Sequence, residues 1–475
     1  MPVSTPTSML RLLRATVLCG LSRRALVAAL AAFAVRTAPG EEGAWSELGT
    51  HVWAAAQPTA TGRTLGALQA WNGKLYVGYG DYGANTGPIH VLAYDPARAA
   101  FTNEFPAFET EAIYLFRPLF GRLYIPPIDP RASSGIAVGR AGSGWSVQEV
   151  FMTHGFDVAT LTGGDLWLVG SSDQSPAYGS TALRSVDDGA TWQLSLNERT
   201  ANDDWSRYYF AGVLNGRLYV QSSETNRCRV FDGAGWSEGP DIARYGALAQ
   251  TFGNKMVLLS HHATPNDIAE LVAFDSVQTQ AVLNAVYTFT VSGGTLYALG
   301  ADRCVRGTTN LSDWATVCTN APEGSRSLAV LNNRLYVGTT QSVLQVYSEP
   351  LGSRPTVRVL PTQERVSESG ASAGRFTVRR TEASEDALTV RYAVSGSAAA
   401  GEDYVALAGT VTIPSGAASA DIDLVPIDDR LAEGPEFVTL ALVADADYAI
   451  EEPAEARIMI DRDSDGAVLL LTRCP

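Results

Sequence analysis

Lysine, cysteine and histidine are scarce in this chain of 475 residues. Lys74 and Lys255 are its only lysines among 35 basic residues, and it holds five cysteines and five histidines. So few cysteines exclude a densely disulfide-bonded scaffold. The formal net charge of −15 excludes the basic face on which nucleic-acid binders depend. We therefore expect no nucleic-acid partner.

Long hydrophobic runs are also missing. No run reaches the roughly 20 apolar residues of a membrane-spanning helix. The run Ala25–Val35 follows the pair Arg23-Arg24, and Ala32-Phe33-Ala34 offers a cleavage site. This order predicts that residues 1–43 are a signal peptide or related export segment. Ser22–Val27 also resembles a twin-arginine signal, so the general secretory and twin-arginine routes both stay open.

Glycine and aromatic residues are abundant. The chain has 44 Gly, 18 Tyr and 9 Trp, a composition that favours strands and tight turns over helices. A hydrophobic share of 46% against 18% charged residues supplies a packed core. We expect an all-β protein with about two to four domains.

A hairpin motif recurs seven times between residues 44 and 350. Each copy is a turn dipeptide followed by a polar or basic residue, Leu or Met, and an aromatic or apolar residue. The copies begin at Asn72, Phe120, Gly163, Asn215, Gly253, Gly293 and Asn332. Asn-Gly between apolar runs is the strongest short hairpin signal, and a spacing of roughly 43 residues is typical of propeller blades. The repeat predicts a seven-bladed β-propeller, with six or eight blades as alternatives.

The ends of the repeat region predict how the ring closes. The seventh unit has three strands, and Ala44–Leu48 reads as a lone strand before the first unit. We predict that this strand pairs near Val343–Tyr347 and completes the last blade, which leaves no open sheet edge.

One unit carries a sharper motif, Ser185–Trp192, with the pattern S-x-D-x-G-x-T-W. It resembles the Asp-box of sialidases and other propellers. The resemblance implies a structural turn in which Ser185 and Asp187 hold the loop and Trp192 packs between blades. We find no sequence motif for a Ser-His-Asp set, a phosphate loop or a zinc site, and we predict no catalytic residue.

Two cysteines flank a strand–turn–strand segment. Cys304 and Cys318 lie at the ends of CVRGTTNLSDWATVC. Export permits disulfides, so we predict a Cys304–Cys318 bridge. Free thiols are the alternative for a protein that stays in the cytoplasm.

Acidic residues concentrate after the propeller. Residues 355–465 hold 21 Asp and Glu against nine Arg. Seven strand-like runs lie at 356–360, 374–380, 388–395, 410–414, 419–425, 436–443 and 455–461. Seven short strands with turns between them predict an Ig-like β-sandwich over residues 351–465, followed by a tail at 466–475.

Antiparallel connections place alternate loops at the same end of a sandwich. Eight carboxylates converge on one end in this way: Glu368, Asp403, Asp428, Asp429, Glu433, Glu436, Asp461 and Asp463. Many hard oxygen ligands on loops suit Ca²⁺, and eight exceed what one ion needs. The alternative is an acidic rim that only faces solvent.

The same residues carry a family resemblance. Val366-Ser367-Glu368-Ser369-Gly370, Gly401-Glu402-Asp403-Tyr404, Ile427-Asp428-Asp429, Glu433-Gly434-Pro435-Glu436 and Ile460-Asp461-Arg462-Asp463 occur in order. This segment resembles the Calx-beta domain, the Ca²⁺-binding module of sodium–calcium exchangers. The resemblance implies that the eight carboxylates are Ca²⁺ ligands. Arg430 and Arg462 depart from the exchanger pattern, which implies fewer ions or weaker binding.

Together these patterns predict an exported protein, located in the periplasm, at the cell surface or outside the cell. It would bind Ca²⁺ and serve in recognition or adhesion, with an unknown glycan or protein ligand on the propeller. The alternative function is a glycan hydrolase or lyase with its active site in the propeller funnel. Fold alone does not decide between the two.

Overall fold

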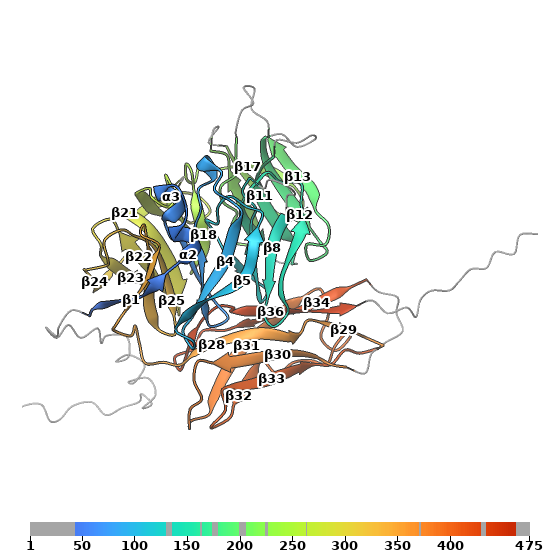
Figure 1. The fold of residues 1–475 in the computed structure, drawn as a ribbon. Helices are drawn as coiled ribbons and strands as arrows, with labels where there is room; N and C mark the ends of the chain where they lie inside the picture. The colour runs from blue at the N-terminus through green and yellow to red at the C-terminus, as the bar shows by residue number, and fades with distance from the viewer. Residues whose placement is uncertain are drawn as a thin grey trace, which may run out of the picture. The chain divides into compact units, whose positions relative to one another are not determined.

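The computed structural model shows an all-β chain with two β architectures (Figure 1). The structure describes residues 43–129, 135–161, 164–172, 179–198, 206–223, 227–262, 264–369, 372–428 and 434–461. The described residues from Gly43 onward belong to one compact unit. The predicted export segment falls almost wholly outside them, as does the predicted tail.

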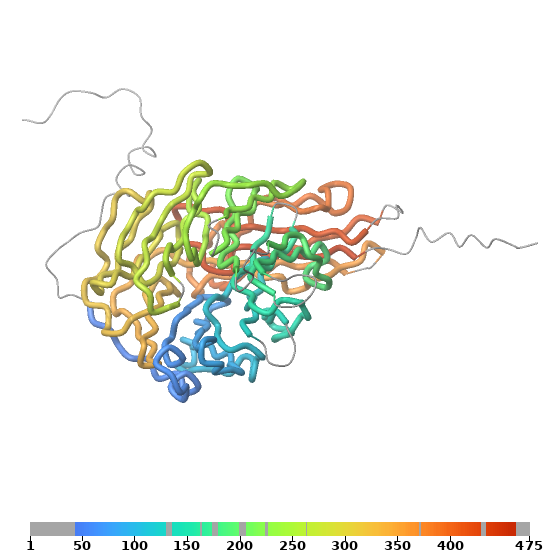
Figure 2. Tube along the Cα trace, turned by 90° about the horizontal axis from the view of Figure 1, so that it is seen from above, coloured from blue at the N-terminus to red at the C-terminus, as the bar shows by residue number. Residues whose placement is uncertain are grey.

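A seven-bladed β-propeller occupies the first part of the described chain. Each blade is a four-stranded antiparallel sheet, and consecutive blades follow one another around the ring (Figure 2). Blade 1 consists of β2 (Ala67–Trp71), β3 (Lys74–Gly78), β4 (Ile89–Asp95) and β5 (Ala100–Phe108). Blade 2 consists of β6 (Arg117–Leu119), β7 (Arg122–Ile125), β8 (Gly135–Arg140) and β9 (Gly144–Glu149). Blade 3 consists of β10 (His154–Thr160), β11 (Leu166–Ser172), β12 (Gly179–Ser185) and β13 (Gln193–Glu198). Blade 4 consists of β14 (Gly212–Leu214), β15 (Arg217–Gln221), β16 (Cys228–Phe231) and β17 (Trp236–Gly239).

One long strand serves two blades. Blade 5 consists of β18 (Ala247–Phe252), β19 (Lys255–Ser260), β20 (Ala269–Phe274) and the first half of β21 (Thr279–Ser292). Blade 6 uses the second half of β21 with β22 (Thr295–Gly300), β23 (Val305–Thr308) and β24 (Ala315–Cys318). Blade 7 consists of β25 (Ser325–Leu331), β26 (Arg334–Thr339), β27 (Val343–Tyr347) and β1 (Trp45–Thr50). The repeat count and the all-β class predicted from sequence are confirmed.

Most of the recurring turn dipeptides place both of their residues at a positive φ. Asn72 and Gly73 have φ of 49° and 76°, and Asn332 and Asn333 have φ of 51° and 56°. Glycine and asparagine tolerate this left-handed region, and it gives the hairpin the twist of its strands. The first two strands of a blade therefore meet at one face of the propeller.

The ring closes as predicted. β1 pairs antiparallel with β27, with Trp45 opposite Tyr347 and Thr50 opposite Val343. Apolar side chains fill the spaces between successive blades, so each blade contributes to two hydrophobic clusters. Two four-residue helices follow β1 in sequence, α2 (Val52–Ala55) and α3 (Ala60–Arg63), and a 3₁₀ turn, η1 (Tyr82–Ala84), lies in the β3–β4 loop.

The second architecture is a two-sheet sandwich. Its strands are β28 (Thr356–Gln363), β29 (Arg365–Ser367), β30 (Gly374–Arg380), β31 (Leu388–Gly396), β32 (Thr410–Ile413), β33 (Ser419–Leu424), β34 (Glu436–Leu442), β35 (Ala449–Ile450) and β36 (Glu455–Asp461). One sheet has the order β33-β30-β28-β35, and the other has the order β29-β36-β34-β31-β32. The two inner faces share a core that includes Phe376, Val438 and Ile458.

The first sandwich strand is longer than the sequence pattern indicated. It continues past Leu360 to Gln363 and then switches sheets at Glu364, so that β29 pairs parallel with β36. The expectation of purely antiparallel pairing was therefore wrong, because β28 with β35 and β29 with β36 are parallel. The other six predicted strands lie where the pattern placed them, to within a residue or so.

The sandwich docks on the hairpin-turn face of the propeller. Asn332 N donates to Glu451 Oε1 at 2.5 Å, and Asn72 N donates to the Glu452 carbonyl at 3.1 Å. Phe120 N donates to Glu455 Oε1 at 3.1 Å. The segment from Glu451 to Glu455, which leads from β35 into β36, thus binds the turn amides of blades 7, 1 and 2.

A buried ionic cluster extends the same interface. Arg457 donates to the Gly164 carbonyl at 3.1 Å, and its guanidinium lies over the Phe120 ring. Arg122 pairs with Asp188 and also with Glu364, at 3.2 Å for the second pair. Burial lowers the pKa of Arg457 to about 10. Ion pairs and hydrogen bonds to turn amides both cross the interface, which favours one fixed arrangement.

Candidate functional site

Five of the eight predicted calcium ligands are described, and they gather at one end of the sandwich. Ser367 lies opposite Asp461 in the β29–β36 register, so Glu368 follows at the same level. Glu436 lies opposite Ile460, directly beside Asp461. The predicted ligands Asp429, Glu433 and Asp463 lie outside the described residues.

Two loops bring the other carboxylates to this acidic end. Ile427 N donates to the Asp403 carbonyl at 2.9 Å, which places Asp428 beside the β31–β32 connection. Ala399 N donates to Asp403 Oδ2 at 2.6 Å and fixes that side chain. Glu368 and Asp403 are buried, with exposed fractions of 8% and 7%. Carboxylate oxygens on loops of this kind are the ligands that a hard cation prefers.

Arg365 is the basic residue that meets the acidic end in the described chain. Its guanidinium binds both carboxylate oxygens of Asp461, with Nε to Oδ2 at 3.1 Å. The sequence reasoning named Arg430 and Arg462 instead, and both lie outside the described residues. Among the residues the structure describes, no three His, Cys, Asp or Glu side chains are grouped closely enough to hold a metal. The described carboxylates share an end of the sandwich without forming a closed cage.

Three cavities with overlapping linings follow one another through the centre of the propeller, and we refer to this series as the axial channel. At the sandwich face it widens to a cavity of about 430 Å³, whose lining includes Arg117, Gln250, Thr290, Glu452 and Glu455. A second, smaller cavity shares Gln69, Gln250 and Thr290 with the first. A third shares Tyr114, Leu115 and Leu248 with the second and lies at the opposite face. Glu452 and Glu455 therefore form the channel floor.

The opposite end of the channel is an aromatic mouth, formed by residues from four blades and the loops between them. Its cavity of about 50 Å³ is lined by Tyr114, Phe156, Tyr209 and His262 among others. The Phe156 and Tyr209 rings lie 4.5 Å apart, and Tyr209 also contacts Tyr245 at 5.9 Å. Tyr82 packs edge-on against Tyr114 at 5.8 Å. These rings are only half-buried, so the mouth presents aromatic surface.

Charged groups of both signs surround the mouth. Asp129, Asp267 and Arg207 act electrostatically on the Tyr82 hydroxyl, whose pKa is raised chiefly by burial. Arg207 Nη1 donates to the Tyr209 hydroxyl at 3.5 Å. Burial also lowers the pKa of His262, which favours its neutral imidazole. His262 lines the mouth cavity, and Asp129 is close enough to act on Tyr82.

A hydrogen-bonded chain of Ser171, His154 and Asp129 was missed in the sequence. Ser171 Oγ lies 3.1 Å from His154 Nδ1, and His154 Nε2 lies 2.5 Å from Asp129 Oδ1. A hydrolase triad has the reverse polarity, with the nucleophile at Nε2, and it exposes its serine. Ser171 and His154 are each only 4% exposed. This chain therefore orients the Asp129 carboxylate at the mouth and does not present a nucleophile.

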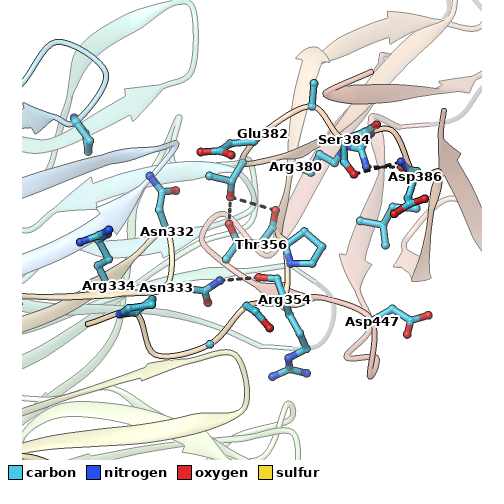
Figure 3. A pocket seen from close by; sticks show the side chains of 18 of the residues that line it. Asn332, Asn333, Arg334, Arg354, Thr356, Arg380, Glu382, Ser384, Asp386 and Asp447 are labelled. Carbon is cyan, nitrogen blue, oxygen red and sulfur yellow. Dashed lines mark hydrogen bonds between the residues drawn. The ribbon is translucent and has the colours of Figure 1, made fainter. Parts of the chain in front are cut away.

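A cleft of about 840 Å³ lies beside the interdomain linker, between the Asn332-Asn333 turn and the β30–β31 loop (Figure 3). Asn333 donates to the Arg354 carbonyl at 2.6 Å across it. Arg380 donates to the carbonyls of Ser384, Asp386 and Ala417. Because the Asn333 and Arg380 side chains already bind backbone carbonyls, we interpret the cleft as part of the structural connection between the propeller and the sandwich.

The Ser185–Trp192 motif holds the turn between β12 and β13. Asp187 Oδ1 accepts from the Ser185 hydroxyl and from Thr191 N, each at 2.8 Å. Trp192 packs against the cluster between blades 2 and 3. The next residue, Asp188, serves the sandwich interface described above. The motif therefore has a structural role, and it lies on the propeller face opposite the aromatic mouth.

The cysteine pair lies in blade 6. Cys318 is opposite Val305, the residue after Cys304, in the β23–β24 register. Cys304 Sγ is 3.9 Å from the Asp302 carbonyl oxygen. The Cys304–Cys318 bridge stays a prediction.

The sandwich topology and the acidic end can now be set against known families. Residues 352–464 match the Calx-beta domain family. The described Calx-beta strands and the five described carboxylates lie within this match. The resemblance inferred from the sequence motifs is confirmed for this part of the chain.

Two solved Calx domain structures show low similarity to this chain. The apo-form Calx CBD1 domain is 24% identical over 22% of this chain and 97% of its own, with a TM-score of 0.20. The calcium binding domain CBD12 of CALX1.1 is 24% identical over 22% of this chain, with a TM-score of 0.20. The match spans 43% of that second structure, less than half its length.

A different relative aligns with more of the chain. An auxiliary nutrient binding protein from Bacteroides ovatus ATCC 8483 is 11% identical over 50% of this chain and 70% of its own, with a TM-score of 0.35. A search of curated proteins finds no match. No helix in the described part of the chain is long and apolar enough to cross a membrane.

Proposed function

We propose that this chain is an exported, calcium-binding recognition protein. Its propeller binds a ligand at the aromatic mouth, and its Calx-beta domain is a Ca²⁺-stiffened module. The observation that carries the proposal is the polarity of the channel. The Calx-beta residues Glu452 and Glu455 occupy one end, and half-buried aromatic rings with polar groups line the other. A concave aromatic site with a few placed polar groups is the usual form of a ligand site.

The calcium part of the proposal rests on the acidic end of the Calx-beta domain. Its ligands would come from Glu368, Asp403, Asp428, Asp429, Glu433, Glu436, Asp461 and Asp463. Glu368 and Asp403 are buried and share their end with Glu436 and Asp461. Such oxygen ligands fit a hard divalent cation. Bound Ca²⁺ would neutralise their mutual repulsion and tie the loops together.

The Arg365–Asp461 pair sets a condition on this site. If Asp461 joins the Ca²⁺ coordination shell, its carboxylate must give up the ion pair with the Arg365 guanidinium. Arg365→Ala should therefore strengthen Ca²⁺ binding by up to about fivefold, since a surface ion pair contributes up to about 1 kcal/mol. Equal or weaker Ca²⁺ affinity in this variant would exclude Asp461 from the ligand set.

An array of extracellular glycans and proteins, probed with the full chain, tests the recognition function. We expect a ligand whose binding is lost in the double variant Phe156→Ala/Tyr209→Ala. Trp53→Ala is the control, because Trp53 is 43% exposed but does not line the mouth cavity. Ligand binding that survives in the double variant would contradict the assignment of the mouth. Turnover of an array glycan would instead favour the hydrolase or lyase alternative.

A further inference from the structure

We infer that the aromatic mouth takes a neutral carbohydrate, with a sugar ring stacked on the Phe156–Tyr209 pair and its hydroxyls held by Asp129. The inference rests on the proposed function, because it names the ligand class of the same mouth. It depends on three features of the described residues: partly exposed aromatic rings, an oriented carboxylate and charged groups of both signs.

The aromatic surface suits the apolar face of a pyranose. Phe156 and Tyr209 lie on neighbouring blades, and their centroids are 4.5 Å apart at an angle of 54°. His154 is nearly parallel to Phe156, with 3° between the planes. A tilted pair of half-buried rings offers one face and one edge to a ligand. Sugar C–H groups pack on such surfaces as other apolar groups do.

The Asp129 carboxylate is held in place by the side chains behind it. Ser171, His154 and Asp129 form the hydrogen-bonded chain described above, and Asp129 N donates to the Thr153 carbonyl at 3.0 Å. A carboxylate fixed in this way loses little freedom when it accepts hydroxyl protons. Hydrogen bonds to a charged acceptor are stronger than those between neutral groups. His154 and Ser171 are thus positioning residues for Asp129.

The charges around the mouth favour a neutral ligand. In the part of the mouth that the structure describes, the carboxylates of Asp81, Asp129 and Asp267 and the guanidiniums of Arg207 and Arg244 lie near the tyrosine rings, so groups of both signs are present. Arg244 lies 5.2 Å from the Tyr245 ring centroid, so a cation already uses that aromatic face. A sugar hydroxyl can accept from a guanidinium and donate to a carboxylate at once. An anionic or a cationic ligand would satisfy only one of these groups.

Titration of the full chain with defined probes tests the ligand class. The probes are neutral hexasaccharides of glucose, mannose and N-acetylglucosamine, an oligogalacturonate, and tetramethylammonium chloride. We expect a neutral hexasaccharide to bind. Phe156→Ala should weaken its binding about tenfold, and Asp129→Asn should weaken it about tenfold to a hundredfold. Trp53→Ala should leave the affinity unchanged.

A double-mutant cycle separates positioning from folding. His154→Gln should weaken sugar binding in the parent chain. It should add little in the Asp129→Asn background, because His154 acts through Asp129. Additive losses, or no loss from His154→Gln alone, would overturn the positioning role.

The outcomes also distinguish this inference from the proposed function. Mouth-dependent binding of only the oligogalacturonate, tetramethylammonium or a protein from the array would overturn the neutral-sugar class and leave recognition intact. Binding of any ligand with equal affinity to wild type and Phe156→Ala/Tyr209→Ala would overturn both.

Discussion

Glu452 illustrates how the docked arrangement changes the chemistry of a single side chain. Burial at the channel floor raises the pKa of Glu452 from its ordinary 4.5 to about 7. Glu455 raises it further, while the Ala454 amide and Arg117 oppose the shift. A carboxyl whose pKa is raised in the folded state stabilises the fold below pH 4.5. That contribution is lost as the pH rises through about 7.

Replacing Glu452 with Gln should therefore stabilise the protein at high pH alone. We expect Glu452→Gln to gain about 3 kcal/mol at pH 8.5 and almost nothing at pH 4.5, from 1.36 kcal/mol per pKa unit. Thermal unfolding followed by circular dichroism across this range measures the difference. The control is Glu382→Gln, in the β30–β31 loop. If the free energies of unfolding of wild type and Glu452→Gln change with pH in the same way, the interface does not raise the pKa of Glu452.

Residues acting within one local motif were predictable, and residues acting across the fold were not. The Ser185 and Asp187 contacts follow from their spacing in the turn. His154 and Ser171 lie opposite each other in the β10–β11 register of blade 3, and packing against blade 2 adds Asp129. No local spacing marks such a chain. The one feature of the sequence that could have indicated it is His154, which begins an inner strand and lies opposite Ser171 on the next strand.

At the scale of elements, hydrophobic alternation and turn chemistry determined most strands. Blades and sandwich strands follow from apolar runs between turn residues with positive φ. The exceptions have physical causes. β21 is long because one extended segment pairs with β20 at its start and with β22 at its end. β29 joins the second sheet because the chain bends at Glu364, where Arg122 binds it.

Removal of β1 tests ring closure. A chain that begins at residue 51 should lose stability and aggregate, because the edge of β27 is then exposed. A chain that begins at Gly43 keeps β1 and is the control. Light scattering and thermal unfolding compare the two. A monomeric shortened chain with an unchanged melting temperature would mean that β1 contributes nothing to closure.

The cysteine pair offers a test within blade 6. If the Cys304–Cys318 bridge forms, closing a loop of about 15 residues should stabilise the protein by about 3 kcal/mol in the chain-entropy model. Peptide mapping of non-reduced protein from an oxidising compartment should reveal the crosslinked pair. Complete alkylation of both cysteines in that sample would refute the bridge.

At the scale of the molecule, docking of the Calx-beta domain was not predictable from the sequence. The sequence indicated two modules and a linker at residue 350. The structure shows Glu451, Glu455 and Arg457 bound to hairpin turns of blades 7, 2 and 3. Each partner is an ordinary turn amide or carbonyl, so no pattern identifies it. Hydrogen bonds and ion pairs across a fixed interface favour cooperative unfolding of both domains.

Breaking the ionic cluster should uncouple the domains. In Arg457→Ala, Asp188 loses one of its cations and the Phe120 ring loses its cover. We expect a loss of about 3 kcal/mol or more, as for a buried pair with one partner removed. Calorimetry should then resolve two transitions. The exposed Arg375→Ala is the control, and a single unchanged transition in Arg457→Ala would contradict coupling through this cluster.

The most direct test of the account is calorimetry of the full chain with and without Ca²⁺. When the free Ca²⁺ concentration is a hundred times the Kd, bound Ca²⁺ should raise the free energy of unfolding by about 2.7 kcal/mol. Spread over one cooperative unit of this size, that energy raises the melting temperature by roughly 3 °C. Asp428→Ala should abolish the shift, and Glu385→Ala, in the β30–β31 loop, should retain it. A melting temperature indifferent to millimolar Ca²⁺ would contradict the claim that the acidic end of the Calx-beta domain binds calcium.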